Sequence, residues 1–553
     1  MRSPTVPIAL TVVLLAGGCG GASDEGGGES GSAVSTSPPD ARLTLVADED
    51  PVAAAASTSR ALFDTADVAV VARDGDTAGT LLGASAATGL GVPLLLEPSG
   101  GGPADALTAE LERLGTTTVL AVGAAEGGGV GAAERAGEGG PEVVAVPADA
   151  EAVEEATGLD LGGDQQVDGG AEAAAVAGLD PEQPAALVIG DAPEPPAGDD
   201  PGELPAVERA EPLDGTIVLS TGGPESVAGV ATARAAGARV QLTEGTDPRG
   251  SAELVELLGE QQPETVVALG AGFGAEEGLE WKLDVAATGA QLPGGGQLLF
   301  PGRMMIALYG STEGAALGVL GEQDLEASIE RARSTAAPYE ELVDVPVVPA
   351  FEIIVTVASS AAGPDGNYST EQSVEDVRPW VEAAGEAGLY VVLDLQPGRT
   401  DFVTQAEQYR PLLELPHVGL ALDPEWRLKP DQVHLQQIGQ VSIDEVNDVV
   451  TWLADLTREN ALPQKLLVLH QFQVRMIPER ERLDTSRDEL ALMVHVDGQG
   501  SQPAKQDTWR VLRQTEPDEV AWGWKNFYDE DLPVLTPEQT VEVEPRPDLV
   551  SYQ

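Results

Sequence analysis

Short apolar segments alternate with amphipathic stretches along most of the chain. In the first half, apolar segments at 68–75, 89–96 and 118–123 are separated by amphipathic stretches at 76–88 and 104–114. The same order recurs later, with apolar segments at 216–223, 237–243 and 264–270 and amphipathic stretches at 224–236 and 251–259. Apolar strands that alternate with helices predict parallel sheets covered on both faces. We therefore expect two copies of a strand–helix–strand–helix–strand unit, with a weaker related unit between them that has a strand at 186–190.

The second half shows the same alternation over a longer series. Seven apolar segments predict strands at 303–309, 351–357, 389–395, 418–423, 466–472, 492–497 and 520–525. Amphipathic stretches between them predict helices that include 322–336, 371–387, 401–415, 442–460 and 504–514. This pattern predicts a TIM-like (β/α) barrel with seven or eight strands, the eighth of which the pattern does not locate. The fold class is α/β throughout.

Composition changes near residue 295. The preceding sequence is rich in Ala, Gly and Glu, whereas six of the seven tryptophans and all four histidines follow it. The run Gln291–Gly296 marks this change with Pro and Gly. We therefore expect an α/β repeat region over 45–297 and the barrel over 298–553.

The N-terminus has the layout of an export signal. Arg2 precedes an apolar run, Ile8–Leu15, and the small residues Ala16–Gly18 lead to Cys19. The apolar run is too short to span a bilayer, which takes about 20 residues. Cys19 is the only cysteine, so the chain has no internal disulfide.

This segment resembles a bacterial lipoprotein signal with its lipobox, although Ala16 occupies the position where leucine is commonest. The resemblance implies a signal peptide over 1–18, lipid attachment at Cys19 and a location on the outer face of the cell membrane or in the cell wall. The alternative is an ordinary secretory signal with a chance cysteine. The Gly-, Ser- and acid-rich sequence that follows predicts a flexible tether over 19–44.

The charge of the chain excludes some partners. With 92 acidic and 30 basic residues, the net charge is -62, which repels nucleic acids and anionic lipid headgroups. An anionic wall polymer would be repelled too unless cations bridge it or salt screens it. Two explanations stay open: a surface adapted to high salt, or an acidic exported protein from a high-GC genome.

Four segments of the first half carry a resemblance to a known family: Ser59–Ala66, Val92–Leu96, Ala104–Leu107 and Val119–Gly123. They are similar to the cell-wall-binding repeat family of type two, over roughly 45–290 and most clearly in the first copy. The family's fuller opening motif, with a glycine and a second arginine, is absent. The resemblance implies small three-layer α/β units that hold proteins on bacterial cell walls. The alternative is a decayed scaffold that acts as a spacer.

Polar residues follow the apolar segments of the predicted barrel. Because the C-terminal strand ends of such barrels form the active face, we expect these side chains to meet there. They are Asp394, Gln396, Asp423, Glu425, His470, Gln471, His495, Asp497 and Lys525.

The segment Leu422–Trp426 places Asp423 and Glu425 one residue apart at the end of the fourth predicted strand. On an extended chain both carboxyl groups would point the same way, and a protonated one could donate to a glycosidic oxygen. The element resembles the Asp-x-Glu of chitinase-like and lysozyme-like barrel glycosidases, without their Asp-rich lead-in. The resemblance implies that Glu425 is the general acid and Asp423 its partner.

We therefore hypothesise a surface lipoprotein that binds the cell wall and hydrolyses a cell-wall or other extracellular glycan without a cofactor or metal. Asp394 completes the catalytic set, and six further residues are predicted to bind substrate: His470, His495, Asp497, Trp522, Trp524 and Lys525. The indole rings are included because they stack on sugar faces.

Two alternatives stay open. The first is a metal-dependent hydrolase with ligands among Asp394, Asp423, His470, His495 and Asp497. The second is a lipoprotein whose barrel binds a ligand without turnover. The second half also resembles an uncharacterised barrel domain of actinobacterial secreted lipoproteins, which implies no activity.

Overall fold

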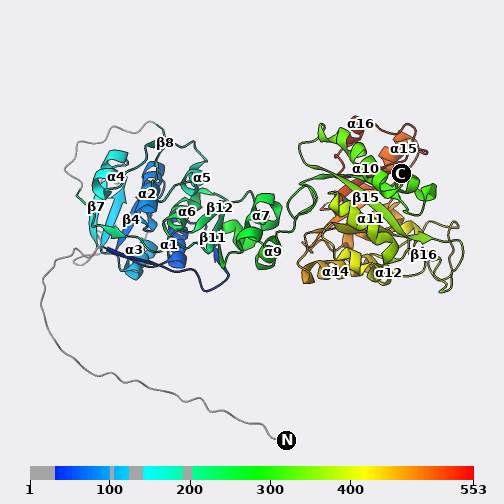
Figure 1. Ribbon diagram of the computed structural model, residues 1–553, viewed down its shortest axis with the longest axis horizontal. Helices are drawn as coiled ribbons and strands as arrows, with labels where there is room; N and C mark the ends of the chain where they lie inside the picture. Colours follow the sequence, from blue (N-terminus) through cyan, green and yellow to red (C-terminus); the bar gives the residue numbers. More distant parts are fainter. Residues whose placement is uncertain (1–31, 100–104, 124–140, 191–201, 518) are drawn as a thin grey trace, which may run out of the picture.

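The computed structural model describes residues 32–99, 105–123, 141–190, 202–517 and 519–553. The predicted signal peptide and Cys19 lie outside these residues. The chain forms two lobes side by side along its long axis, with α/β layers in one and a barrel in the other (Figure 1). Within the described ranges, we find no helix with the length and apolar character needed to cross a membrane.

The N-terminal lobe contains two four-stranded parallel sheets with the same strand order. The first runs β5-β4-β6-β7 and the second β12-β11-β13-β2. The strands of the first are β4 (Val68–Arg73), β5 (Leu94–Glu97), β6 (Thr118–Val122) and β7 (Glu142–Val146). Those of the second are β2 (Leu43–Val46), β11 (Thr216–Ser220), β12 (Arg239–Leu242) and β13 (Thr265–Leu269). The predicted internal repeat is therefore confirmed as an equivalence of β4, β5 and β6 with β11, β12 and β13.

The helices of this lobe include α1 (Pro51–Leu62), α2 (Thr77–Leu90), α3 (Asp105–Leu114), α6 (Val227–Ala235), α7 (Ala252–Gln261), α8 (Ala271–Ala275) and α9 (Leu279–Ala286). Four of them, α2, α3, α6 and α7, follow the predicted stretches, whereas α1, α8 and α9 were not predicted. Small residues dominate α1, α2 and α6, which lets these helices approach closely and share one core with the first sheet. The weaker unit between the copies consists of α4 (Ala150–Thr157), β8 (Asp164–Gln166), α5 (Glu172–Ala177) and β9 (Ala186–Val188).

The predicted tether is wrong over its second part. The strand β1 (Ser32–Thr36) pairs antiparallel with β3 (Phe63–Ala66) and parallel with β10 (Val207–Glu208). The strand β2 completes the second sheet beside β13. Its Leu-Thr-Leu-Val sequence suits a strand, and pairing partners distant in sequence outweigh the low apolar content around it. Only 19–31 of the predicted tether remain, and these lie outside the described residues.

The C-terminal lobe is a closed barrel of eight parallel strands, as the α/β fold class predicts. In chain order the strands are β14 (Met304–Gly310), β15 (Val347–Ala358), β17 (Tyr390–Leu395), β18 (Val418–Leu422), β19 (Lys465–Gln471), β20 (Leu490–Val496), β21 (Ala521–Asn526) and β22 (Leu549–Tyr552). The seven predicted strands are confirmed. The eighth is β22, which lies between β21 and β14, and the β14–β15 pairing closes the barrel. A short strand, β16 (Ser369–Glu371), adds antiparallel to β15.

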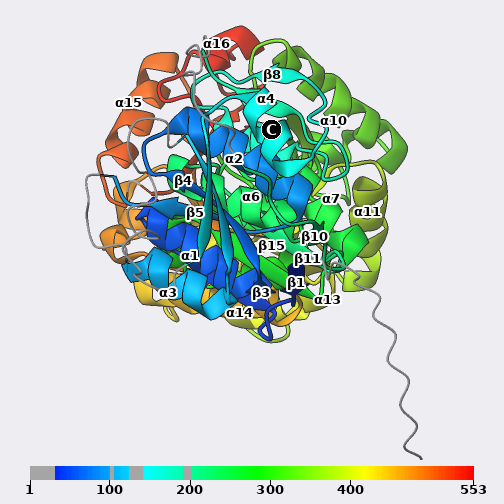
Figure 2. The same cartoon turned by 90° about the vertical axis from the view of Figure 1, so that its left-hand side faces the viewer.

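Helices surround the barrel. They are α10 (Leu325–Glu340), α11 (Val374–Glu386), α12 (Phe402–Gln408), α13 (Arg410–Leu413), α14 (Ile443–Glu459), α15 (Gln502–Arg513) and α16 (Pro537–Val541). Seen along the long axis, α10, α11, α14 and α15 form a ring behind the N-terminal lobe (Figure 2).

Side-chain alternation divides each barrel strand between two cores. The outward set packs beneath the helices, and the inward set fills the barrel with apolar residues at its N-terminal end. Inward residues of this lower layer are Met305, Ala307, Val348, Ala350, Val392, Ala421, Val468, Met493 and Leu549. Two residues further along a strand, the next inward position lies nearer the C-terminal mouth, which positions the site described below.

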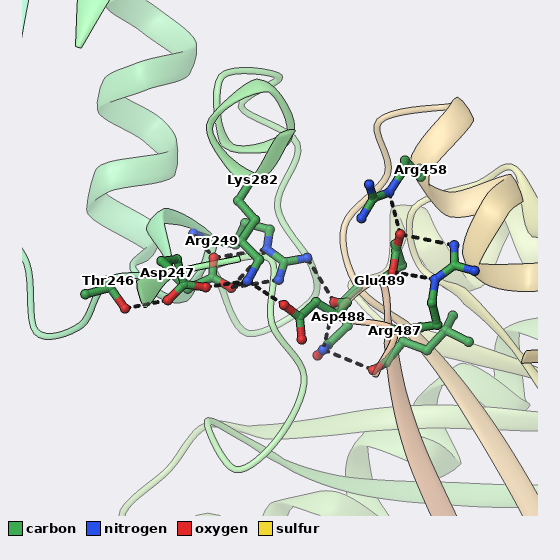
Figure 3. A network of polar contacts seen from close by, with 11 residues as sticks. Thr246, Asp247, Arg249, Lys282, Arg458, Arg487, Asp488 and Glu489 are labelled. Atoms are coloured by element: carbon green, nitrogen blue, oxygen red, sulfur yellow. Dashed lines mark hydrogen bonds and ion pairs between the residues drawn. The ribbon is translucent and has the colours of Figure 1, made fainter. Parts of the chain in front are cut away.

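An ion-pair network joins the two lobes (Figure 3). The buried Lys282 of α9 contacts Asp247 and Glu276 in its own lobe, and its Nζ lies 2.5 Å from Asp488 Oδ2 of the barrel lobe. Arg249 donates to the Asp488 carbonyl oxygen at 3.0 Å. Polar contacts of the buried Lys282 and Arg249 therefore cross the predicted boundary at 297/298. The boundary itself stays a proposal.

Candidate functional site

The C-terminal mouth of the barrel is lined by the inward positions that follow the apolar layer. Six strands place such a residue two positions after an apolar inward residue, and β18 places one directly after its last residue. The residues are Tyr309, Glu352, Asp394, Asp423, His470, His495 and Ser551, and Lys525 occupies the inward position of β21. A buried apolar layer thus gives way to a polar and charged layer across the barrel.

His470 is at the centre of this layer. Its Nε2 lies 2.7 Å from Glu352 Oε1, and its Nδ1 lies 3.2 Å from Asp497 Oδ2. Burial alone would lower the pKa of His470, but the negative charge of Glu352 and the hydrogen bond to Asp497 raise it well above its usual range. Burial likewise opposes ionisation of Glu352, yet the His470 charge lowers the Glu352 pKa to about 2.

His495 packs beside this group, with its ring centroid 4.9 Å from that of His470. Its Nε2 lies 3.2 Å from Ser551 Oγ of β22. Burial lowers the pKa of His495 to about 3, so the ring is neutral. A Cβ at Gly523 would come within 2.3 Å of His495 Cδ2, so a glycine on β21 makes room for this ring.

Asp394 and Asp423 lie beside each other in this layer. Asp394 accepts a hydrogen bond from the Tyr309 hydroxyl at 2.9 Å, and Lys525 Nζ lies 3.4 Å from the centroid of the Tyr309 ring. Burial raises the pKa of Asp394 to about 6. Burial and the neighbouring Asp394 charge raise the pKa of Asp423 well above its usual range.

The expected extended geometry of the Asp-x-Glu element is wrong. Strand β18 ends at Leu422, and Pro424–Trp426 form a 3₁₀ turn with Asp423 as its N-cap. Asp423 Oδ1 accepts from the Glu425 backbone N–H at 3.1 Å. Aspartate at an N-cap and proline at the first helical position both favour such a turn over a continued strand.

A cavity of about 360 Å³ opens above the polar layer. Its lining includes Tyr309, Gln396, Asp423, Glu425, Trp426, Phe472, Asp497, Lys525, Phe527 and Gln553. Burial, followed by the Asp497 charge, raises the pKa of Glu425 to about 7, although Lys525 and His470 oppose the shift. The turn therefore presents Glu425 to the cavity even though the strand has ended.

Two predicted binding residues face away from the cavity. The rings of Trp522 and Trp524 lie 5.9 and 5.5 Å from that of Trp509 on α15, in the core between the barrel and its helices. Their positions alternate with Lys525 and Gly523 on β21, so they point to the opposite face of the sheet. The prediction that they stack on sugars is therefore wrong, and Trp426 is the tryptophan that lines the cavity.

The remaining predicted residues come together at one end of the barrel, except Gln471, whose side chain instead contacts Arg480 and the backbone of Gln473 and Val474. Asp423, Glu425, Asp497 and Lys525 line the cavity, whereas Asp394, His470 and His495 are fully buried. Sequence reasoning missed Tyr309, Glu352 and Ser551. A glutamate within the apolar run Phe351–Val355 was the one available signal.

Comparisons with known proteins give only weak similarities. No protein-family model and no curated protein match the chain. Among solved structures, Cwp6 from Clostridium difficile matches with a TM-score of 0.33 and 13% identity over 64% of this chain and 63% of that chain. Cwp8 from Clostridium difficile matches with a TM-score of 0.32 and 14% identity over 46% of this chain and 53% of that chain. The present chain thus aligns with less than two thirds of either protein, and neither similarity assigns it a function.

Proposed function

We propose that the barrel hydrolyses a glycan of the cell wall or another extracellular glycan, with Glu425 as general acid. The observation that carries this proposal is the Glu425 carboxyl in the mouth cavity, with its pKa raised to about 7. Such a group keeps its proton near neutral pH and can deliver it to a glycosidic oxygen.

The neighbouring carboxyl groups supply the other half of the chemistry. Asp497 accepts from the His470 ring and lines the same cavity, where its negative charge stabilises a positively charged sugar ring in the transition state. Asp423 caps the turn that carries Glu425, so it sets the position of the acid. Trp426 and Phe472 give the cavity apolar faces against which a sugar ring can pack.

The direct test compares release of reducing ends from purified peptidoglycan by the natural chain and by Glu425→Gln. The substitution keeps the shape and removes the transferable proton, so we expect a loss of about 10²- to 10⁴-fold. Glu313→Gln is the matched control, because Glu313 lines a neighbouring hollow and not the mouth cavity. Equal activity in the Glu425→Gln chain would refute the assignment, and an inactive natural chain would favour a barrel that binds without turnover.

A second candidate is a metal-dependent hydrolase on the same barrel. It is favoured by a group of three potential ligands, Glu352, His470 and His495. Of the five predicted ligands, this set contains His470 and His495, and Glu352 takes the place of the three aspartates. Chelator would abolish the activity of such an enzyme, whereas acid catalysis by Glu425 needs no metal.

We also propose that the N-terminal lobe holds the protein on the cell wall and that Cys19 carries a lipid anchor. The two equivalent α/β sheets support the repeat interpretation. A fragment that began at residue 45 would cut β2 and open the second sheet, so the test uses the chain from Ser32 onward.

The chain from Ser32 onward carries Glu425→Gln to prevent cleavage, and soluble chitooligosaccharide is added to occupy the barrel. Under these conditions it should still sediment with purified walls. Because the chain is acidic, divalent cations or salt should strengthen retention by an anionic polymer. Absence of sedimentation at every salt concentration would leave the spacer alternative.

A further inference from the structure

Three metal-ligating side chains meet beneath the floor of the cavity. Glu352 of β15, His470 of β19 and His495 of β20 each offer one ligand atom, and these atoms all lie within 4.8 Å of one another. All three residues are at most 1% exposed. Two imidazoles and one carboxylate form a recurrent ligand set for catalytic zinc and for non-haem iron.

The second nitrogen of each histidine ring already has a partner outside the group. Asp497 Oδ2 lies 3.2 Å from His470 Nδ1, and Ser551 Oγ lies 3.2 Å from His495 Nε2. Metal-ligating histidines commonly bond their other ring nitrogen in this way, which holds the ring and its tautomer. This leaves His470 Nε2 and His495 Nδ1 as the two nitrogens that could bind one metal ion together with Glu352.

Two atoms of the group have no hydrogen-bond partner among the residues the structure describes. They are His495 Nδ1 and Glu352 Oε2. A buried polar atom without a partner loses its hydration with nothing in return, so such atoms call for an explanation. An ion pair between His470 and its two carboxylates accounts for His470 but leaves His495 Nδ1 without a role.

The surrounding charge also favours a cation here. Glu352 and Asp497 each place a carboxylate oxygen within 3.2 Å of a nitrogen of the His470 ring, and Glu352 is itself one of the three ligands. Asp497 lines the cavity and bonds His470, so only this side chain separates His470 Nδ1 from the cavity on that side.

We propose that Glu352, His470 and His495 bind one divalent transition-metal ion, of the zinc or iron(II) class, beneath the cavity. Imidazole nitrogens select such ions over calcium and magnesium, which prefer oxygen ligands. The ion offsets the negative charge of Glu352 and Asp497 and holds three strands in register. This inference does not rest on glycan hydrolysis by Glu425, and it supplies the ion that the second candidate function requires.

The test uses the full chain after removal of metal by chelator and buffer exchange. Titration with Zn²⁺ should load one ion per chain, measured by elemental analysis after desalting, and should raise the thermal midpoint. Titration with Co²⁺ should give the visible absorption of a nitrogen- and oxygen-ligated ion, a readout that needs no variant. Absence of a stoichiometric ion in both titrations would overturn the proposal.

Variants locate the ion. Glu352→Gln and His495→Gln should abolish stoichiometric loading, and Ser551→Ala should weaken it by about 10- to 100-fold through loss of an outer hydrogen bond. His417→Gln is the control, because His417 bonds the Val381 carbonyl oxygen outside the mouth and should load as the natural chain does. Unchanged affinity in Ser551→Ala together with a folded, fully loaded Glu352→Gln would refute this ligand set.

These results are independent of the glycan assay. Loss of glycan hydrolysis in Glu425→Gln with normal metal loading supports both proposals. Metal loading of a chain that cleaves no glycan overturns the proposed function alone, and glycan cleavage by a chain that loads no metal overturns the metal site alone.

Discussion

The protonation state of Glu425 predicts how activity depends on pH. Burial and the Asp497 charge raise the Glu425 pKa to about 7, so about half of the molecules carry the proton at pH 7. A glutamate with an ordinary pKa of about 4.3 would be protonated in only roughly one molecule in 500 at that pH. The environment of Glu425 therefore makes the acid form about 250 times more abundant than in an exposed glutamate.

The rate of reducing-end release should accordingly fall above pH 7, by about tenfold for each further pH unit, because the acid form disappears. Lys525 lowers the Glu425 pKa, so Lys525→Met should move this fall to higher pH. Glu425→Gln should remove the fall along with most of the activity. The assay measures initial rates between about pH 5 and pH 9 at constant ionic strength.

Two outcomes would refute this reasoning. A fall at the same pH in Lys525→Met would show that another group titrates. A rate that rises through pH 7 would indicate a base or a metal-bound hydroxide, as in the second candidate function.

Four further predictions concern single side chains. Asp423→Asn keeps the N-cap acceptor, so we expect an unchanged thermal midpoint with a reduced kcat; a lower midpoint would show that the cap needs the carboxyl. Trp426→Ala should raise KM for glycan oligomers more than it lowers kcat, and an unchanged KM would remove this ring from the binding site. Lys282→Met removes the ion pairs of a buried ammonium with Glu276 and Asp488 and should cost about 1–3 kcal/mol of stability by calorimetry, less than loss of a fully buried pair because Asp488 is half exposed; an unchanged midpoint would contradict this. Cys19→Ala should release the protein from membranes into the medium, and full membrane retention would refute the lipid anchor.

Much of the fold could be predicted because parallel strands covered by helices have a strong sequence pattern. The segments 418–423 and 466–472 are apolar, short and separated by an amphipathic stretch, and they became β18 and β19. Strand β22 escaped detection because Leu549–Tyr552 is only four residues long and contains a serine. The strands β1 and β2 escaped because their stability comes from pairing partners distant in sequence.

The site could be predicted where the alternation of side chains between the two faces of a strand could be followed. His470 and His495 lie directly opposite each other in the register of β19 and β20, and both point inward. The same alternation places Trp524 outward and the next residue, Lys525, inward, so Trp524 and Lys525 could not line the same cavity. Glu352 was missed because its partners lie on strands more than a hundred residues away.

The most direct test of glycan hydrolysis by the barrel is mass spectrometry of peptidoglycan incubated with the protein in H₂¹⁸O. Hydrolysis that depends on Glu425 predicts soluble glycan fragments with one ¹⁸O at each new reducing end, and none above background with Glu425→Gln. Fragments without ¹⁸O, or labelled fragments released equally by Glu425→Gln, would contradict the account.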